Sequence, residues 1–185
     1  FPSPTFDGQG HRIYGLRLTQ SASTLGLFSR VEQGAVVKNL VVEGEVVPSG
    51  TQSRVGGIAG ENYGSIESCR FSGVVLVEDS VGGIAGRNGE SGTISGCTVF
   101  GAVRGTQYTG GIAGENAGTL LRCTNAAAVN TVVRDEDLSA AEMEELESTI
   151  YSLLKSEKTA ESAVTTDTGG IAGYSSGVLQ SCVNT

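Results

Sequence analysis

Four cysteines offer the most reactive chemistry in this chain, and they recur in one register. Counted from the second glycine of a repeated glycine-rich hexapeptide, they follow at 12, 14, 12 and 12 residues, as Cys69, Cys97, Cys123 and Cys182. Cysteines 26 to 59 residues apart lack the paired spacing of a zinc ribbon. In a degenerate copy of the repeat the equivalent position holds Leu40, so the site accepts an aliphatic side chain. We therefore expect reduced, buried thiols at these positions.

Other side chains with catalytic chemistry are scattered along the sequence. His11 is the only histidine, which excludes a site with two histidine ligands and favours an ordinary surface residue. One position after each hexapeptide holds a polar residue: Glu61, Arg87, Glu115 and Tyr174. These residues form either a surface charge ladder, which we favour, or half of a sugar-binding face. A carbohydrate-active enzyme needs carboxylates, or a carboxylate and a cation, converging on adjacent repeats. Arg87 separates the two glutamates, so we predict no catalytic residue, no cofactor and no metal site.

The elements that position these residues follow from the repeat. The hexapeptide Val55-Gly56-Gly57-Ile58-Ala59-Gly60 returns at residues 81–86, 109–114 and 168–173. Five residues after the second glycine comes an amide or a hydroxyl, at Asn62, Asn88, Asn116 and Ser175. Aliphatic residues then stand in one register at Ile66, Ile94, Leu120 and Leu179. Self-similarity at this period indicates one supersecondary unit stacked on copies of itself.

Stacking predicts an all-β fold, a right-handed parallel β-helix (β-solenoid) of about five coils with three short strands per coil. The aliphatic and thiol side chains then form inward ladders, because equivalent residues lie above one another at about 4.8 Å. The structural ladder residues are Ile58, Ile84, Ile112 and Ile171, together with Cys69, Cys97, Cys123 and Cys182. Residues 1–185 are predicted to be a single module with an opening strand at 6–18, a degenerate coil at 25–50, and coils at 55–80, 81–108, 109–133 and 168–185.

The repeat spacing is interrupted once, and we expect a helical insertion at residues 134–163. Ser139 and Glu142 have the spacing of a capping box. An apolar stripe follows at three- and four-residue steps, at Met143, Leu146, Ile150, Leu153 and Leu154. The back of this helix is acidic, and it is either solvated, which we favour, or a docking element for a partner or a Ca²⁺ site. Asp135 and Asp137 lack the spaced oxygen ligands and the glycine of a calcium loop, which weakens the metal alternative. The possible docking residues are Glu142, Glu145, Leu146 and Ile150. We expect the stripe to pack on a sheet face or across an open end of the solenoid.

The repeated segment GGIAGENxGxIxxC, with the opening FDGQGHRIYGLRL before it, resembles the GLUG-motif repeats of large bacterial surface and secreted proteins. The resemblance covers about residues 6–130 and 164–185, with isoleucine in place of the leucine of the motif's core. It implies a spacer or a display surface on an adhesin-like protein, and it carries over no catalytic residue.

Composition narrows the function further. The net charge is −8, which is poorly suited to a nucleic-acid or anionic-membrane partner, and no apolar run reaches the length of a membrane span. We expect a non-catalytic repeat segment, part of a longer chain, located at the cell surface or outside the cell. It would act as a stalk or as an adhesive surface for an unknown protein or glycan. The alternative is a carbohydrate-active β-helix enzyme or a glycan-binding module.

Overall fold

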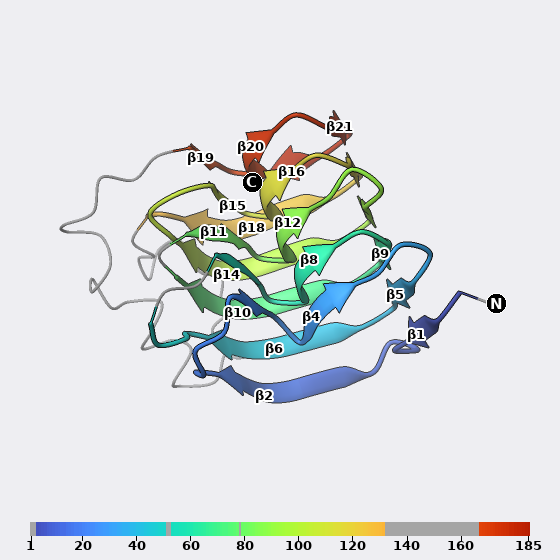
Figure 1. Cartoon of the computed structure of the whole chain (residues 1–185), viewed down its shortest axis with the longest axis horizontal. Helices are drawn as coiled ribbons and strands as arrows, with labels where there is room; N and C mark the ends of the chain where they lie inside the picture. Colours follow the sequence, from blue (N-terminus) through green and yellow to red (C-terminus); the bar gives the residue numbers. More distant parts are fainter. Residues whose placement is uncertain (1–2, 51–52, 78, 132–166) are drawn as a thin grey trace.

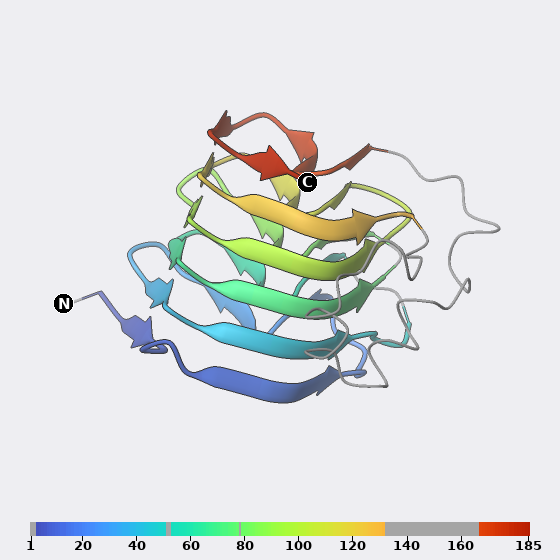
Figure 2. The same ribbon diagram turned by 180° about the vertical axis from the view of Figure 1, so that it is seen from behind.

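The structure is a computed structural model that describes residues 3–50, 53–77, 79–131 and 167–185. These residues form 22 β-strands and no helix. The strands belong to four sheets that wind around a common axis for about four turns (Figures 1 and 2). Strand pairs are parallel in every sheet. The prediction of an all-β parallel solenoid is confirmed; the count of about five coils is not, and right-handed winding stays a prediction.

Each sheet takes one strand from each successive coil. Sheet A contains β1 (Thr5–Asp7), β5 (Val36–Lys38), β9 (Ser65–Glu67), β13 (Thr93–Ser95), β17 (Thr119–Leu121) and β21 (Val178–Gln180). Sheet B contains β2 (Arg12–Leu18), β6 (Val41–Val46), β10 (Arg70–Leu76), β14 (Thr98–Arg104), β18 (Thr124–Val129) and β22 (Val183–Asn184). Sheet C contains β3 (Thr24–Leu25), β7 (Arg54–Gly56), β11 (Ser80–Gly82), β15 (Thr109–Gly110) and β19 (Thr168–Gly169). Sheet D contains β4 (Phe28–Val31), β8 (Ala59–Asn62), β12 (Ala85–Asn88), β16 (Ala113–Asn116) and β20 (Ala172–Ser175).

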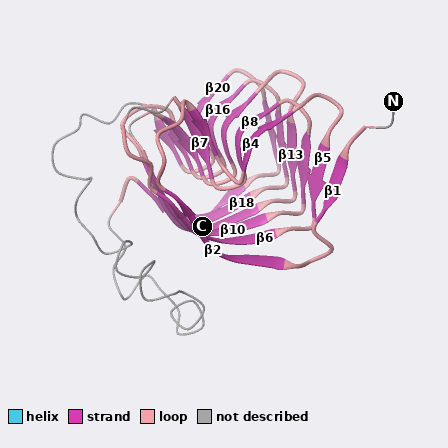
Figure 3. Cartoon of the chain, turned by 60° about the horizontal axis from the view of Figure 1, so that its bottom comes forward, coloured by secondary structure: helices cyan, strands magenta, loops and turns pink. Residues whose placement is uncertain are grey.

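A full coil therefore has four strands, and the expectation of three per coil is wrong. The glycine-rich hexapeptide is not one strand, because it turns a sharp corner between β7 and β8. A Cβ atom at Gly56 would overlap the carbonyl oxygen of Ala59 on the far side of this corner. Glycine permits this close approach of backbone to backbone. The corner separates sheets C and D along the whole stack, as the view in Figure 3 shows.

A second corner, between sheets A and B, has left-handed backbone angles in every coil. The residues at this corner are Asn39, Ser68, Gly96, Arg122 and Ser181, with φ of 54°, 51°, 61°, 50° and 54°. Left-handed angles are uncommon for residues other than glycine. Their recurrence at the same position of successive coils indicates that the corner is set by the winding of the chain rather than by the local residue.

The core is a set of columns that run along the solenoid axis. Ile58, Ile84 and Ile112 are 0% exposed, and Ile171 packs half-buried at the C-terminal end. The cysteines also stack, because the amide of Thr98 donates to the carbonyl of Cys69 and the amide of Thr124 to that of Cys97. All ladder residues named from the sequence thus lie at equivalent inward positions of successive coils.

The predicted helix at 134–163 lies outside the described residues. The structure does show how the stack continues across it: Thr109 of β15 pairs with Thr168 of β19, so the coil after the insertion lies directly on the coil before it. The side chains at the two ends also meet, because Nδ2 of Asn130 donates to Oγ1 of Thr168 at 2.9 Å. A short connection would therefore suffice between β18 and β19.

Replacing residues 134–162 with a short glycine-serine linker is expected to leave a folded solenoid. Loop-closure entropy changes by only about 0.6 kcal/mol for each doubling of loop length, so the connection itself contributes little. Circular dichroism should remain β-rich and thermal unfolding cooperative, with some loss of stability or solubility. A linker of the original length separates the effect of loop length from the loss of these side chains. A variant unfolded at room temperature would show that the segment belongs to the core.

Candidate functional site

The thiol column is sealed in the core. Cys97 and Cys123 are 0% exposed and Cys69 is 2% exposed, whereas Cys182 in the last coil is half-buried. Each sulfur lies near backbone carbonyls, for example Sγ of Cys123 at 3.4 Å from the oxygen of Ile94. All four cysteines are free thiols. A thiolate reacts only where it can form and be reached, so this column is part of the core packing rather than a reactive site.

Burial also shifts the acidity of these thiols. The side-chain contact with Cys69, together with burial, raises the pKa of Cys97 well above its ordinary value of 9.0. Burial raises the pKa of Cys123 to about 11. Both groups therefore keep their protons in the folded protein at pH values where the unfolded chain has lost them.

The free energy of unfolding should consequently fall as the pH rises from about 9 to about 11. The unfolded chain binds fewer thiol protons than the folded chain in this window, and each thiol contributes about 1.4 kcal/mol per pH unit at most. Urea unfolding at several pH values measures the slope, and the Cys123→Ala variant should have a shallower slope than the parent. A thiol reagent at neutral pH should modify Cys182 first. Equal slopes in the two proteins would contradict the shifted pKa of Cys123.

Polar side chains stand in two columns beside the glycine corner, and we call these columns the polar strip. Sheet D contributes one column to it, in which paired strands place Arg30, Glu61, Arg87, Glu115 and Tyr174 at successive levels. Sheet C contributes a second column, with Arg54, Ser80 and Tyr108. The four residues expected from the sequence to form a ladder thus occupy adjacent levels of one sheet.

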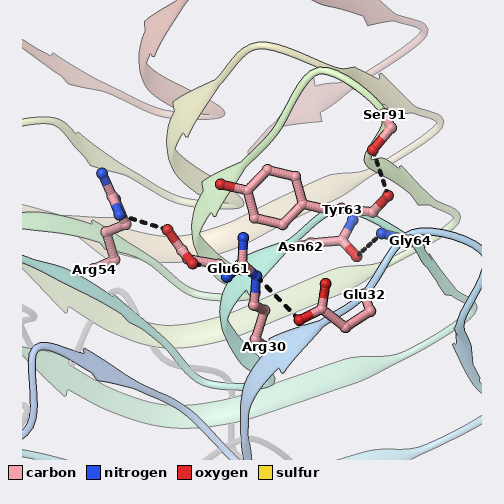
Figure 4. A network of polar contacts seen from close by, with 8 residues as sticks. All are labelled: Arg30, Glu32, Arg54, Glu61, Asn62, Tyr63, Gly64 and Ser91. Carbon is pink, nitrogen blue, oxygen red and sulfur yellow. Dashed lines mark hydrogen bonds and ion pairs between the residues drawn. The ribbon is translucent and has the colours of Figure 1, made fainter.

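The lower half of the polar strip is an ion-pair network centred on Glu61 (Figure 4). Its Oε1 accepts a hydrogen bond from Nη1 of Arg54 at 2.5 Å, and its Oε2 lies 3.6 Å from Nε of Arg30. The Glu61 side chain is 8% exposed, so both arginines compensate a carboxylate that has little contact with water. Arg30 also reaches Glu32 at 3.4 Å, and its guanidinium lies 4.5 Å from the ring centroid of Tyr63. Both carboxylate oxygens of Glu61 are therefore engaged by cations.

The upper half combines a second carboxylate with two aromatic rings. Glu115 accepts a hydrogen bond from Oγ of Ser80 at 2.7 Å and lies 4.0 Å from Nε of Arg87. Above it the rings of Tyr108 and Tyr174 lie 5.9 Å apart with their planes tilted by 58°. Tyr174 is 51% exposed. The upper half therefore presents an accessible aromatic surface beside charged groups, which is a combination that sugar rings and planar ligands can contact.

Sequence reasoning missed Arg30, Arg54 and Tyr108 as members of this strip. A signal for Arg30 was present, because the degenerate copy is one residue shorter at the corner: Leu25 pairs with Val55, while Phe28 pairs with Ala59. Allowing for that deletion places Arg30 at the level of Glu61. Nothing in the repeat pattern shows that sheets C and D bring Arg54 to Glu61.

The remaining candidates are not brought together. Nδ1 of His11 lies 2.9 Å from the carbonyl oxygen of Gly8, within its own turn. In the part of the chain that the structure describes, no three side chains of histidine, cysteine, aspartate or glutamate could hold a metal ion. The same described ranges contain no helix long and apolar enough to cross a membrane. The possible docking residues Glu142, Glu145, Leu146 and Ile150 lie outside the described residues.

The fold and its repeats define this chain as a parallel β-solenoid of glycine-rich repeats. Residues 51–76 match the family described as "The GLUG motif", which confirms the resemblance over the coil that begins with β7. The chain is also 32% identical over 83 residues to Halomucin of Haloquadratum walsbyi. That similarity covers 44% of this chain and 1% of Halomucin. No solved structure matches the chain.

Proposed function

We propose that this chain is a non-catalytic repeat segment of a larger cell-surface or secreted protein, serving as a stalk or an adhesive surface. The observation that carries the proposal is the location of the repeated residues. The isoleucines, cysteines and asparagines that recur in each coil point inward, with exposed fractions of 0 to 2% in the complete coils. The surface column between them changes from arginine to glutamate to tyrosine. The repeated residues therefore belong to the scaffold, as expected for a spacer.

The proposed location can be tested on cells that produce the parent protein. Brief protease treatment of intact cells, followed by mass spectrometry, should release peptides of this chain together with those of other surface proteins. A cytoplasmic enzyme measured in the same supernatant controls for lysis. Recovery of these peptides only after lysis would contradict the proposed location.

A second candidate function is glycan binding at the upper half of the polar strip. The ring pair of exposed Tyr174 and half-buried Tyr108 beside Arg87 and Glu115 supports it, because aromatic faces stack on sugar rings and charged groups bind hydroxyls. An enzyme is less well supported. Glu61 and Glu115 lie two coils apart, and both oxygens of Glu61 are held by arginines. The two residues therefore do not form the pair of carboxylates that a glycosidase uses.

A glycan array with the purified chain tests binding and separates the two functions. A glycan held by the strip should be lost with Tyr108→Ala and Tyr174→Ala but retained with Tyr14→Ala, a matched exposed tyrosine in β2. Reducing-end assays on any bound polysaccharide test for catalysis, and we expect none. Binding that survives the loss of both rings would place the glycan site elsewhere.

A further inference from the structure

The polar strip contains one arginine that is only weakly engaged by the protein. Arg87 lies between Glu61 and Glu115 in the sheet D column, and Glu61 is already held by the two arginines below it. Among the described residues, the charged group that Arg87 approaches is Glu115, with 4.0 Å between Nε and Oε2. This separation is beyond hydrogen-bond distance. The Arg87 side chain is 32% exposed, so its guanidinium can donate to a bound ligand.

The groups around Arg87 favour a ligand without charge. Glu115 accepts from Oγ of Ser80 at 2.7 Å and keeps acceptor capacity at its half-buried carboxylate, so a donor and an acceptor stand at adjacent levels. Their charges cancel. Asp167, at the next level of the sheet C column after Tyr108, is exposed and anionic. Together with the net charge of −8, these carboxylates would repel a uronate or a sulfated sugar, whereas hydroxyl groups can bind to both Arg87 and Glu115.

An unusual backbone angle accompanies the aromatic pair above these groups. Tyr108 has φ of 43°, which is uncommon for a bulky residue. The equivalent residues of lower coils, Arg54 and Ser80, lie inside strands β7 and β11 without a positive φ. The left-handed angle ends the strand before Tyr108, so β15 begins only at Thr109. The Tyr108 ring then pairs with the exposed ring of Tyr174, and strained residues of this kind cluster at ligand sites.

We propose that the upper half of the polar strip binds a neutral glycan that lies along the solenoid axis. One sugar ring stacks on Tyr174, and the hydroxyls of the next sugar bind Glu115 and Arg87. Tyr174, Glu115 and Arg87 occupy three successive levels, which span about 10 Å at about 4.8 Å per coil. This span is longer than one pyranose ring, so the ligand is at least a disaccharide. The inference rests on the glycan-binding candidate above and adds the charge class and the orientation of the ligand.

Isothermal titration calorimetry of the full chain tests the charge class. The neutral probes are cellohexaose, mannohexaose and xylohexaose, and the acidic probe is hexagalacturonate. At low salt, at least one neutral probe should bind and the acidic probe should not. Failure of every neutral probe overturns the proposal. Tighter binding of the acidic probe also overturns it, although glycan binding itself would then stand.

Substitutions at Glu115 test the polar half of the site. Glu115→Gln should weaken binding of the neutral probe about tenfold, because it removes a charged acceptor. The same change leaves Arg87 without its carboxylate, so hexagalacturonate should gain affinity. The matched control is Glu67→Gln on sheet A, where the carboxylate also accepts from a serine, Oγ of Ser65 at 2.6 Å. Equal affinities for the parent and Glu115→Gln, or equal losses for the two variants, would overturn the assignment of Glu115.

Substitutions at the two tyrosines test the aromatic half. Tyr108→Asn removes the ring but tolerates the left-handed angle, and it should weaken binding about tenfold, as should Tyr174→Ala. Tyr174→Phe should retain affinity, because stacking needs the ring and not the hydroxyl. Circular dichroism must show that each variant stays β-rich.

A polyproline peptide serves as the competing probe, since aromatic surfaces also bind such peptides. Peptide binding that depends on Tyr108 and Tyr174, without binding of any neutral glycan, would overturn the proposal. The surface location is tested separately by proteolysis of intact cells, so failure of this inference is distinguishable from failure of the proposed function.

Discussion

Replacing Asn88 with alanine is expected to lower the free energy of unfolding by about 3 kcal/mol, because it breaks a buried amide ladder. Nδ2 of Asn62 donates to Oδ1 of Asn88 at 2.8 Å, and Nδ2 of Asn88 donates to Oδ1 of Asn116 at 2.9 Å. All three side chains are at most 1% exposed. The alanine variant leaves a donor and an acceptor without their ladder partners, and a buried group left unsatisfied costs about 1–3 kcal/mol.

Urea unfolding followed by circular dichroism measures this loss. The matched control is Ser175→Ala at the end of the same ladder, where Oγ accepts from Nδ2 of Asn116 at 3.0 Å but the residue is exposed. Water replaces that hydroxyl, so the change should stay below about 1 kcal/mol. Similar losses for the two variants would show that the ladder's hydrogen bonds do not stabilise the fold.

An Asn88→Asp variant separates hydrogen bonding from packing, since the two side chains have nearly the same shape. A buried carboxyl has a raised pKa, so the folded variant binds its proton more tightly than the unfolded chain does. Its stability relative to the parent should therefore be highest at acidic pH and should fall as the pH rises above about 4. A pH-independent difference from the parent would contradict this.

A Gly101→Ala substitution is expected to be at least as damaging, at about 4 kcal/mol. Gly101 has φ of 115°, which strains a residue with a side chain, and its Cβ would overlap the carbonyl oxygen of Gly73 in the adjacent coil. Backbone strain and overpacking each contribute about 1–3 kcal/mol. Ala127 occupies the same position in the next coil without a positive φ, and there the Asn125 side-chain amide accepts from its N–H and donates to its carbonyl. The strained conformation is therefore a property of β10 and β14.

The control for Gly101 is Gly96→Asn, at the corner between sheets A and B. Gly96 also has a positive φ, 61°, but equivalent corners already hold Asn39, Ser68 and Arg122. The nearest atom to a Cβ there is Oγ of Ser68 at 3.6 Å, which is ordinary contact. We expect a change within about 0.5 kcal/mol, since a less flexible unfolded chain offsets the strain. Comparable losses at positions 96 and 101 would show that positive φ alone, rather than the approach of adjacent coils, makes these glycines necessary.

The period of the sequence determined that coils stack in parallel and which residues share a level. The isoleucines Ile58, Ile84 and Ile112 recur at the same spacing as the cysteines and the asparagines. Only a stack of coils buries each residue against the equivalent residues of the neighbouring coils. Cross-coil pairing depends on spacing along the chain, and spacing is visible in the sequence. The shared register of Asn62, Asn88 and Asn116 is visible in the same way, and an asparagine at a repeated turn can reach the turn above it.

Only the tertiary structure decided how many strands one coil has and which of them lie side by side at a corner. The corner at Gly56 makes four strands instead of three, and it brings Arg54 of β7 to Glu61 of β8. The corners at Ser68 and Arg122 adopt left-handed angles without glycine, so residue type did not mark them. Spacing identifies the residues that repeat, whereas backbone angles at the corners determine which strands of a coil face each other.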